Sequence, residues 1–164
     1  MSFDFSTLVT DRTQADVNRV KQIAEKIKNG TASESELAEF NSAAMKGAYN
    51  YTDLNRVTAA MEALKAKLEG YGYAVPGYQY IEPFSESGWP TPQNMAVYLQ
   101  NVAAIRSVLA VMASTPKVPE DMVGLMVQEA NDIEVILLDV YRQINIMATT
   151  FIPCGEALCG GDNL

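Results

Sequence analysis

The sequence predicts a mainly α-helical protein, a bundle of four to five helices, on the basis of three observations. Apolar residues recur three and four positions apart in several segments, as they do along one face of an α-helix. Capping residues precede these segments, and glycine or proline follows them. Hydrophobic residues make up 48% of the 164 residues, enough for a packed core in one domain. We therefore expect heptad-like apolar stripes around a single helical core.

The chain divides into three parts. Residues 1–12 alternate only loosely between apolar and polar side chains, so we expect an extended arm, either a short strand or a docked segment. Residues 13–152 form the helical domain, and residues 70–91 within it are an aromatic connection. Residues 153–164 contain three glycines, and we expect an irregular or strand-like tail.

The first two helices are predicted over residues 14–28 and from about residue 34 to before Gly47. Thr13 begins a capping box for the first helix, and Ser33 is the N-cap of the second. The apolar stripe of the first is Val17, Val20, Ala24 and Ile27, and the small apolar face of the second is Leu37 and Phe40.

The third helix is predicted over residues 53–69, between Thr52 and Gly70, and the fourth over residues 92–113. Thr91 caps the fourth helix, with proline at its first position, where the missing N–H costs nothing. Their stripes are Leu54, Val57, Met61, Leu64 and Leu68 in the third and Met95, Tyr98, Val102, Ile105, Leu109 and Met112 in the fourth.

The fifth helix is predicted over residues 127–149. Its main stripe is Ile133, Leu137, Val140, Ile144 and Met147, and further apolar side chains stand on its other sides at Ile136, Leu138 and Ile146. A helix that is apolar most of the way round is either central or covered by a partner chain. We therefore take these three further side chains as candidate contacts with a partner.

The aromatic connection concentrates rings beside glycine and proline, at Tyr71, Tyr73, Tyr78, Tyr80, Phe84 and Trp89. A loop this long usually has packing of its own or a function. The first interpretation, which we favour, is that the rings cover an open end of the bundle. The second is that they bind a host glycan or a protein, because tyrosine and tryptophan offer flat apolar faces with a polar edge.

Charge and composition exclude several classes of function. The net charge of −8 repels phosphate, which argues against nucleic acid and anionic membranes as partners. No apolar stretch reaches the roughly 18 residues of a membrane span, and the N-terminus does not resemble a signal peptide. The chain lacks histidine, the usual general base and commonest metal ligand. We therefore predict neither an enzyme nor a cofactor-dependent protein.

Cys154 and Cys159 are the two cysteines, and they lie too close together to staple a fold. We interpret them as free thiols of a reducing compartment. A zinc half-site is the alternative, but no second pair of ligands completes it. Adjacent carboxylates such as Glu34 and Glu36 suit the exposed start of a helix better than acid–base catalysis.

Three segments repeat a local pattern of Asp beside an apolar residue, with another apolar residue three positions further on. They are Ala15–Val20, Thr52–Val57 and Asn131–Ile136. Ordinary helix-start chemistry explains the aspartates. The Asn and Arg side chains within the pattern are expected to bridge to a neighbouring helix or chain.

Three stretches together resemble small proteins encoded among the tail and baseplate genes of phages and prophages of Gram-positive, Clostridia-like bacteria. They are Lys46–Val57, Trp89–Pro92 with Tyr98–Val102, and Glu129–Glu134. The resemblance covers most of residues 8–145, and its most specific part is the Tyr-Asn-x-Thr-Asp-Leu-Asn-Arg-Val stretch at residues 49–57. The cysteine-containing end at residues 153–161 departs from the family pattern.

The resemblance implies a non-enzymatic virion structural protein, made in the bacterial cytoplasm and assembled into a phage tail with further copies or other tail proteins. It implies no site residues. Our alternative is a surface-recognition module that binds glycan through Tyr71–Trp89. The candidate contact residues for either function are Tyr71, Tyr73, Tyr78, Tyr80, Trp89, Ile136, Leu138 and Ile146.

Overall fold

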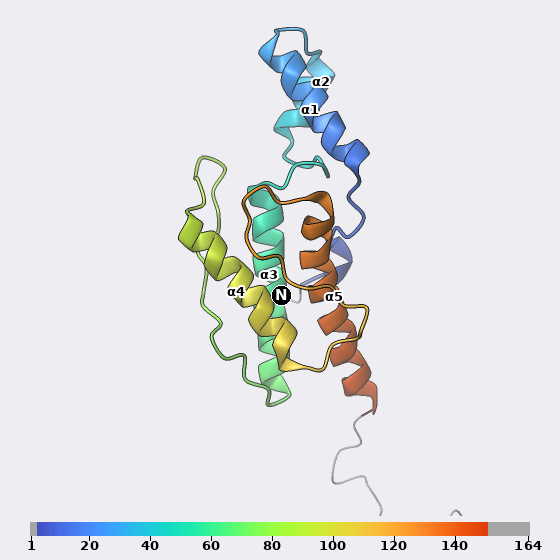
Figure 1. Cartoon of the computed structure of the whole chain (residues 1–164), viewed down its shortest axis with the longest axis vertical. Coiled ribbons are helices and arrows are strands. Elements are labelled where there is room, and N and C mark those ends of the chain that lie inside the picture. Colours follow the sequence, from blue (N-terminus) through green and yellow to red (C-terminus); the bar gives the residue numbers. More distant parts are fainter. Residues whose placement is uncertain (1–2, 151–164) are drawn as a thin grey trace, which may run out of the picture.

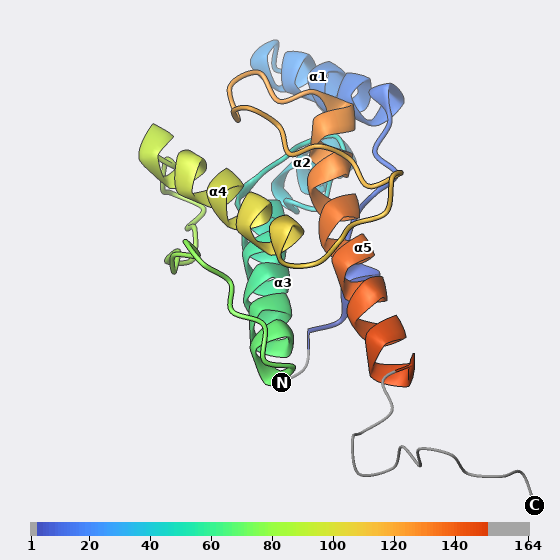
Figure 2. The same ribbon diagram turned by 60° about the horizontal axis from the view of Figure 1, so that its bottom comes forward.

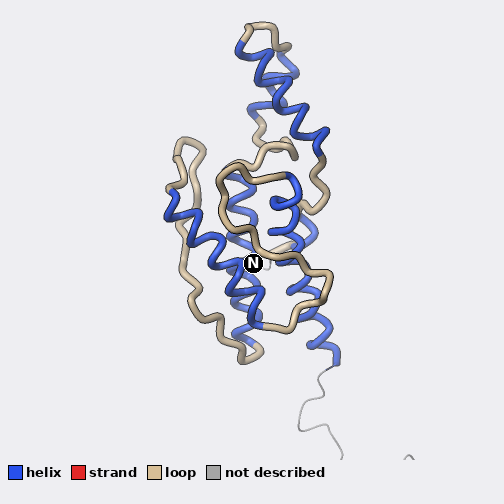
Figure 3. Tube along the Cα trace, in the orientation of Figure 1, coloured by secondary structure: helices blue, strands red, loops and turns tan. Residues whose placement is uncertain are grey.

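The computed structural model describes residues 3–150, and within that range the protein is all-α, with five helices packed together and no strand (Figures 1 and 3). The helices are α1 (Gln14–Lys28), α2 (Glu34–Asn41), α3 (Tyr51–Gly70), α4 (Pro92–Val108) and α5 (Val127–Thr150). The predicted helical bundle is confirmed. The predicted tail at 153–164 lies outside the described residues.

Local capping chemistry sets where the helices begin. Thr13 forms a capping box with Asp16, Ser33 caps α2 and Thr91 caps α4, as predicted. Ser33 also forms a capping box, with Glu36. Helix α3 begins earlier than expected because Asn50, not Thr52, is its N-cap. Asn50 Oδ1 accepts the backbone N–H of Thr52 at 2.8 Å, and its own N–H donates to Asp53.

Helices α3, α4 and α5 pack against one another and form the core. The whole predicted stripe of α3 is buried, as are the first four members of the α5 stripe. Helices α3 and α5 lie side by side and run in the same direction, while α4 crosses obliquely beside them (Figures 1 and 2). The 3–4 spacing is therefore satisfied within one chain.

This direction explains the two long connections. A helix of 20 residues such as α3 is about 30 Å long. If the next helix points the same way, the connection must first return over about the length of the helix just completed. An extended connection with as many residues as that helix is long enough to do so. The aromatic connection returns along α3 and α4, and a second connection, residues 109–126, returns from α4 to the start of α5 (Figure 2).

Helices α1 and α2 pack on each other as a hairpin that projects beyond one end of the core (Figure 1). Its centre is Ile23, which is fully buried, whereas Ala24 of the predicted stripe is exposed. The prediction was wrong there because α2 crosses the Ile23 side of α1. Gly47 fixes the base of the hairpin: a Cβ at this position would lie 2.2 Å from the backbone carbon of Asp16.

Helix α4 ends at Val108, five residues before the predicted end, so Met112 lies in the second connection and is 43% exposed. Polar contacts turn the chain back here. Arg106 Nε donates to the carbonyl oxygen of Pro116 at 2.7 Å, and the Thr115 hydroxyl donates to Asp139 of α5 at 2.9 Å. Neither interaction is visible in the spacing of apolar residues.

The N-terminal arm, residues 3–13, docks on the core. Of the two predicted alternatives, a short strand and a docked segment, the second is therefore confirmed. It contains a short 3₁₀ helix (Phe5–Thr7) rather than a strand. The ring of Phe5 stacks on Tyr141 of α5, with centroids 3.9 Å apart and an interplanar angle of 11°. The arm thus contributes an aromatic side chain to the core of the bundle.

Candidate functional site

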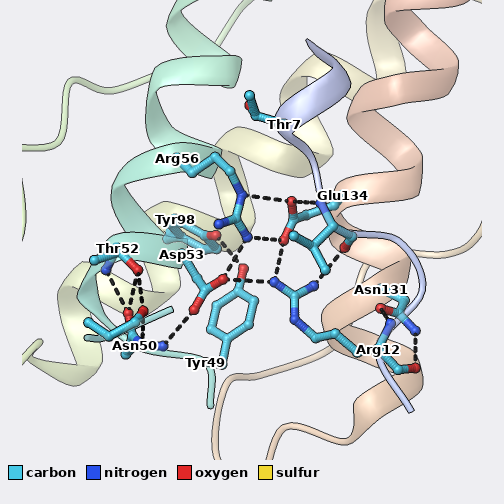
Figure 4. A network of polar contacts seen from close by, with 12 residues as sticks. Thr7, Arg12, Tyr49, Asn50, Thr52, Asp53, Arg56, Tyr98, Asn131 and Glu134 are labelled. Atoms are coloured by element: carbon cyan, nitrogen blue, oxygen red, sulfur yellow. Dashed lines mark hydrogen bonds and ion pairs between the residues drawn. The ribbon is translucent and has the colours of Figure 1, made fainter. Parts of the chain in front are cut away.

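The most concentrated polar chemistry is a buried ion cluster of Arg12, Asp53, Arg56 and Glu134, which joins the N-terminal arm to α3 and α5 (Figure 4). Arg12 Nη2 donates to Glu134 at 2.7 Å and to Asp53 at 2.8 Å. Arg56 Nη2 donates to the same two carboxylates, at 2.8 and 2.6 Å. Two positive and two negative charges therefore meet, and the cluster is neutral.

Each member of the cluster is held by further contacts. Glu134, which is fully buried, also accepts the backbone N–H of Val9 and Nε of Arg56. Arg12 lies 5.2 Å from the ring centroid of Tyr49. Burial lowers the pKa of Arg56, but the hydrogen bonds and negative charges of Glu134 and Asp53 together outweigh burial, so the pKa is raised overall. The guanidinium of Arg56 is therefore held in its charged form.

This arrangement suits a structural anchor rather than acid–base catalysis. A catalytic carboxylate must exchange a proton with substrate, so substrate must be able to reach it. Both carboxylates here are engaged by guanidinium groups, and Glu134 is fully buried. Beside them the hydroxyls of Tyr49 and Tyr98 lie 2.7 Å apart, and burial raises the pKa of both phenols. Both phenols therefore stay protonated and neutral near pH 7.

Three asparagines form a second structural device, in which one side-chain amide pairs with both backbone groups of a residue in an irregular segment. Asn55 of α3 pairs with Phe84 in this way, both distances being 2.8 Å. Asn101 of α4 pairs with Gln79 at 2.7 and 2.9 Å. Asn131 of α5 pairs with Arg12 at 3.0 and 2.9 Å. Each core helix thus satisfies the main chain of a segment that has no strand beside it.

The repeated sequence pattern indicated some residues of the ion cluster and of the asparagine pairs. As predicted, its arginines bridge to neighbouring helices: Arg19 to Glu39 of α2 and Arg56 to Glu134 of α5. Its asparagines behave less uniformly, because Asn55 reaches the aromatic connection whereas Asn18 accepts from Gln14 on its own helix. The roles of Arg12 and Asn101 had no such signal and were missed.

The candidate residues of the aromatic connection fall into two groups. Tyr73 and Tyr78 are partly buried against the core, and Tyr78 donates to Glu62 at 2.9 Å. Burial and this carboxylate raise the pKa of Tyr78. Tyr71, Tyr80 and Trp89 remain exposed, Trp89 to 94%. The rings of the first group cover the core, as the first interpretation predicts, and the rings of the second group are accessible to a partner.

The three candidates on α5 lie in different surroundings. Ile136 is fully buried among the side chains of the core, so it is not available as a contact residue. Leu138 is partly buried against the same core. Ile146, near the end of the helix, is 59% exposed. Of the three, only Ile146 presents most of its surface to solvent, because Ile136 and Leu138 pack with the hydrophobic core.

A small polar hollow of about 280 Å³ lies between the aromatic connection and the start of α4. Its lining combines one exposed ring with amide and carboxylate groups: Gln79, Tyr80, Ile81, Glu82, Gln93, Asn94 and Val97. Trp89 does not line it. Stacking surface beside hydrogen-bonding groups is a chemistry that suits a sugar.

Among residues 3–150, no three His, Cys, Asp or Glu side chains come together as a metal site. Cys154 and Cys159 lie outside the described residues. No helix in the described part of the chain is long and apolar enough to cross a membrane. Comparison with known proteins matched no family model, no curated protein and no solved structure.

Proposed function

We propose that this chain is a non-enzymatic structural protein of a phage or phage-like tail or baseplate, which assembles with further copies or with other tail proteins. The observation that carries the proposal is the exposure of large apolar side chains on a chain that already has a well-packed core. Trp89, Val123 and Met126 are 94%, 91% and 63% exposed. Large exposed apolar surface is typical of protein–protein contacts.

The shape of the molecule supports an assembly role. The hairpin of α1 and α2 projects from the core, and both Leu37 and Phe40 of α2 remain partly exposed at 38%. The ion cluster holds the arm in place, and the pairs of Asn55 and Asn101 hold the aromatic connection. The contact of Thr115 with Asp139 ties the second connection to α5. The sequence resemblance to tail-associated proteins supplies the phage context.

The test is mass spectrometry of particles induced from a lysogen that encodes this chain and purified by density gradient. We expect its peptides to band with the major tail proteins at a fixed ratio. Recovery only in the soluble fraction would refute the proposal. A matched pair of variants refines the test: Trp89→Ser removes an exposed ring and should lower incorporation, whereas Gln22→Ser changes an exposed polar residue of α1 and should leave it unchanged.

The second candidate function, glycan recognition, is favoured by the polar hollow around Tyr80. Binding to a glycan array is the test, with Tyr80→Ala as the variant that removes the ring of the hollow. Trp89→Ala is the control, because Trp89 is exposed but does not line the hollow. Absence of binding, or equal loss with both variants, would exclude a glycan site in this hollow.

A further inference from the structure

An apolar groove of about 590 Å³ runs between α4 and the second connection. One wall is a face of α4, where Met95, Ala96, Leu99 and Ala103 follow helical spacing. The opposite wall comes from the second connection and includes Val118, Pro119, Met122 and Val123. The groove is thus formed by two segments that meet only in the folded chain.

The backbone of these walls restricts what can occupy the groove. The backbone groups along α4 are paired within the helix, and Pro119 has no N–H to donate. An extended peptide would therefore bury its own N–H and C=O groups against apolar side chains without partners, which costs free energy. A helix satisfies its backbone internally and offers only side chains, so it fits this groove best.

The rim of the groove adds a charge preference. The charged side chains among the lining residues are Glu120 and Asp121, and both are exposed. Asp121 already accepts the backbone N–H of Val123 at 2.7 Å, whereas Glu120 makes no hydrogen bond or ion pair with the described residues. Methionine on the walls, at Met95 and Met122, adapts its shape to varied apolar side chains.

We propose that this groove binds an amphipathic helix of another protein, with the apolar face of that helix against α4 and lysine or arginine at its edge beside Glu120 and Asp121. The proposal rests on the proposed assembly function, since it names the kind of partner surface. It concerns a groove that the particle experiment does not probe, and its own test uses the purified chain. A negative result for peptide binding therefore leaves the proposed assembly function standing, and a negative particle experiment does not by itself exclude peptide binding.

The probe is a short amphipathic peptide of leucine and lysine with leucines at helical spacing, and its matched control carries glutamate in place of lysine. We expect the lysine peptide to bind roughly tenfold more tightly, as two rim charge pairs would give. Methionine methyl NMR locates the site: the signals of Met95 and Met122 should shift, and that of the fully buried Met61 should not.

Two variants separate the groove from general attraction between opposite charges. Ala96→Glu places a carboxylate on the groove wall and should abolish binding, whereas Ala24→Glu makes the same change at an exposed position of α1 and should not. Glu120→Lys should reverse the preference between the two peptides. Equal binding of both peptides, full binding by Ala96→Glu, or a self-associated chain whose groove is closed by a second copy would each overturn the proposal.

Discussion

Removing the charge of Glu134 should strongly destabilise the fold. In Glu134→Gln, the shape of the side chain is kept, but Arg12 and Arg56 then share the single carboxylate of Asp53. Breaking a buried ion pair on one side costs about 3–5 kcal/mol. For a chain of this size, each kcal/mol lowers Tm by about 2–4 °C, so we expect a loss of roughly 6–20 °C.

The assay is thermal and urea unfolding followed by circular dichroism. Glu39→Gln is the matched control, because the ion pair of Glu39 with Arg19 is exposed and should contribute less than about 1 kcal/mol. Arg12→Met combined with Glu134→Gln restores charge balance, since the pair of Arg56 with Asp53 remains. That double variant should be clearly more stable than the sum of the two single losses.

A loss for Glu134→Gln as small as that of the control would refute the view that the cluster anchors the arm. Additive losses in the double variant would refute the charge-balance explanation while leaving the contacts themselves in place.

Three further predictions concern other parts of the molecule. A hydrogen bond from Lys26 lowers the pKa of Glu36 from 4.5 to about 2, so the contribution of this carboxylate to stability is present above about pH 4.5 and is lost as the pH falls towards 2. Carboxyl NMR titration should give a midpoint near 2, and Lys26→Met should move it upwards; an unchanged midpoint would contradict the assignment. Gly47→Ala should destabilise the protein by about 1–3 kcal/mol or more in urea unfolding, because its Cβ meets the backbone at the start of α1. Gly70→Ala, where a Cβ meets nothing within 4 Å, should be neutral or stabilising, and similar losses in both would contradict this reasoning. Asn101→Asp keeps the acceptor but removes the donor to the aromatic connection, so it should cost about 1–3 kcal/mol and speed hydrogen exchange in that connection; exchange rates like those of the unchanged protein would count against the pairing.

Short-range patterns in the sequence predicted where the helices lie, although α3 begins earlier and α4 ends earlier than predicted. The capping box at Thr13, the N-caps Ser33 and Thr91 and the apolar stripe of α3 are all as predicted. These features depend on residues three or four positions apart, whose geometry is decided within one or two helical turns. The predicted stripe of α1 was wrong at Ala24, because α2 packs against the side of α1 that carries Ile23 and leaves Ala24 exposed.

Tertiary structure alone decided the rest. That α3 and α5 run in the same direction, and that the aromatic connection returns along the core, depends on packing between whole helices. The ion cluster joins residues 12, 53, 56 and 134, and the apolar groove joins α4 to a connection with no periodicity of its own. Such contacts close long loops, and their loop-closure entropy is recovered only when the core forms, so no local spacing encodes them.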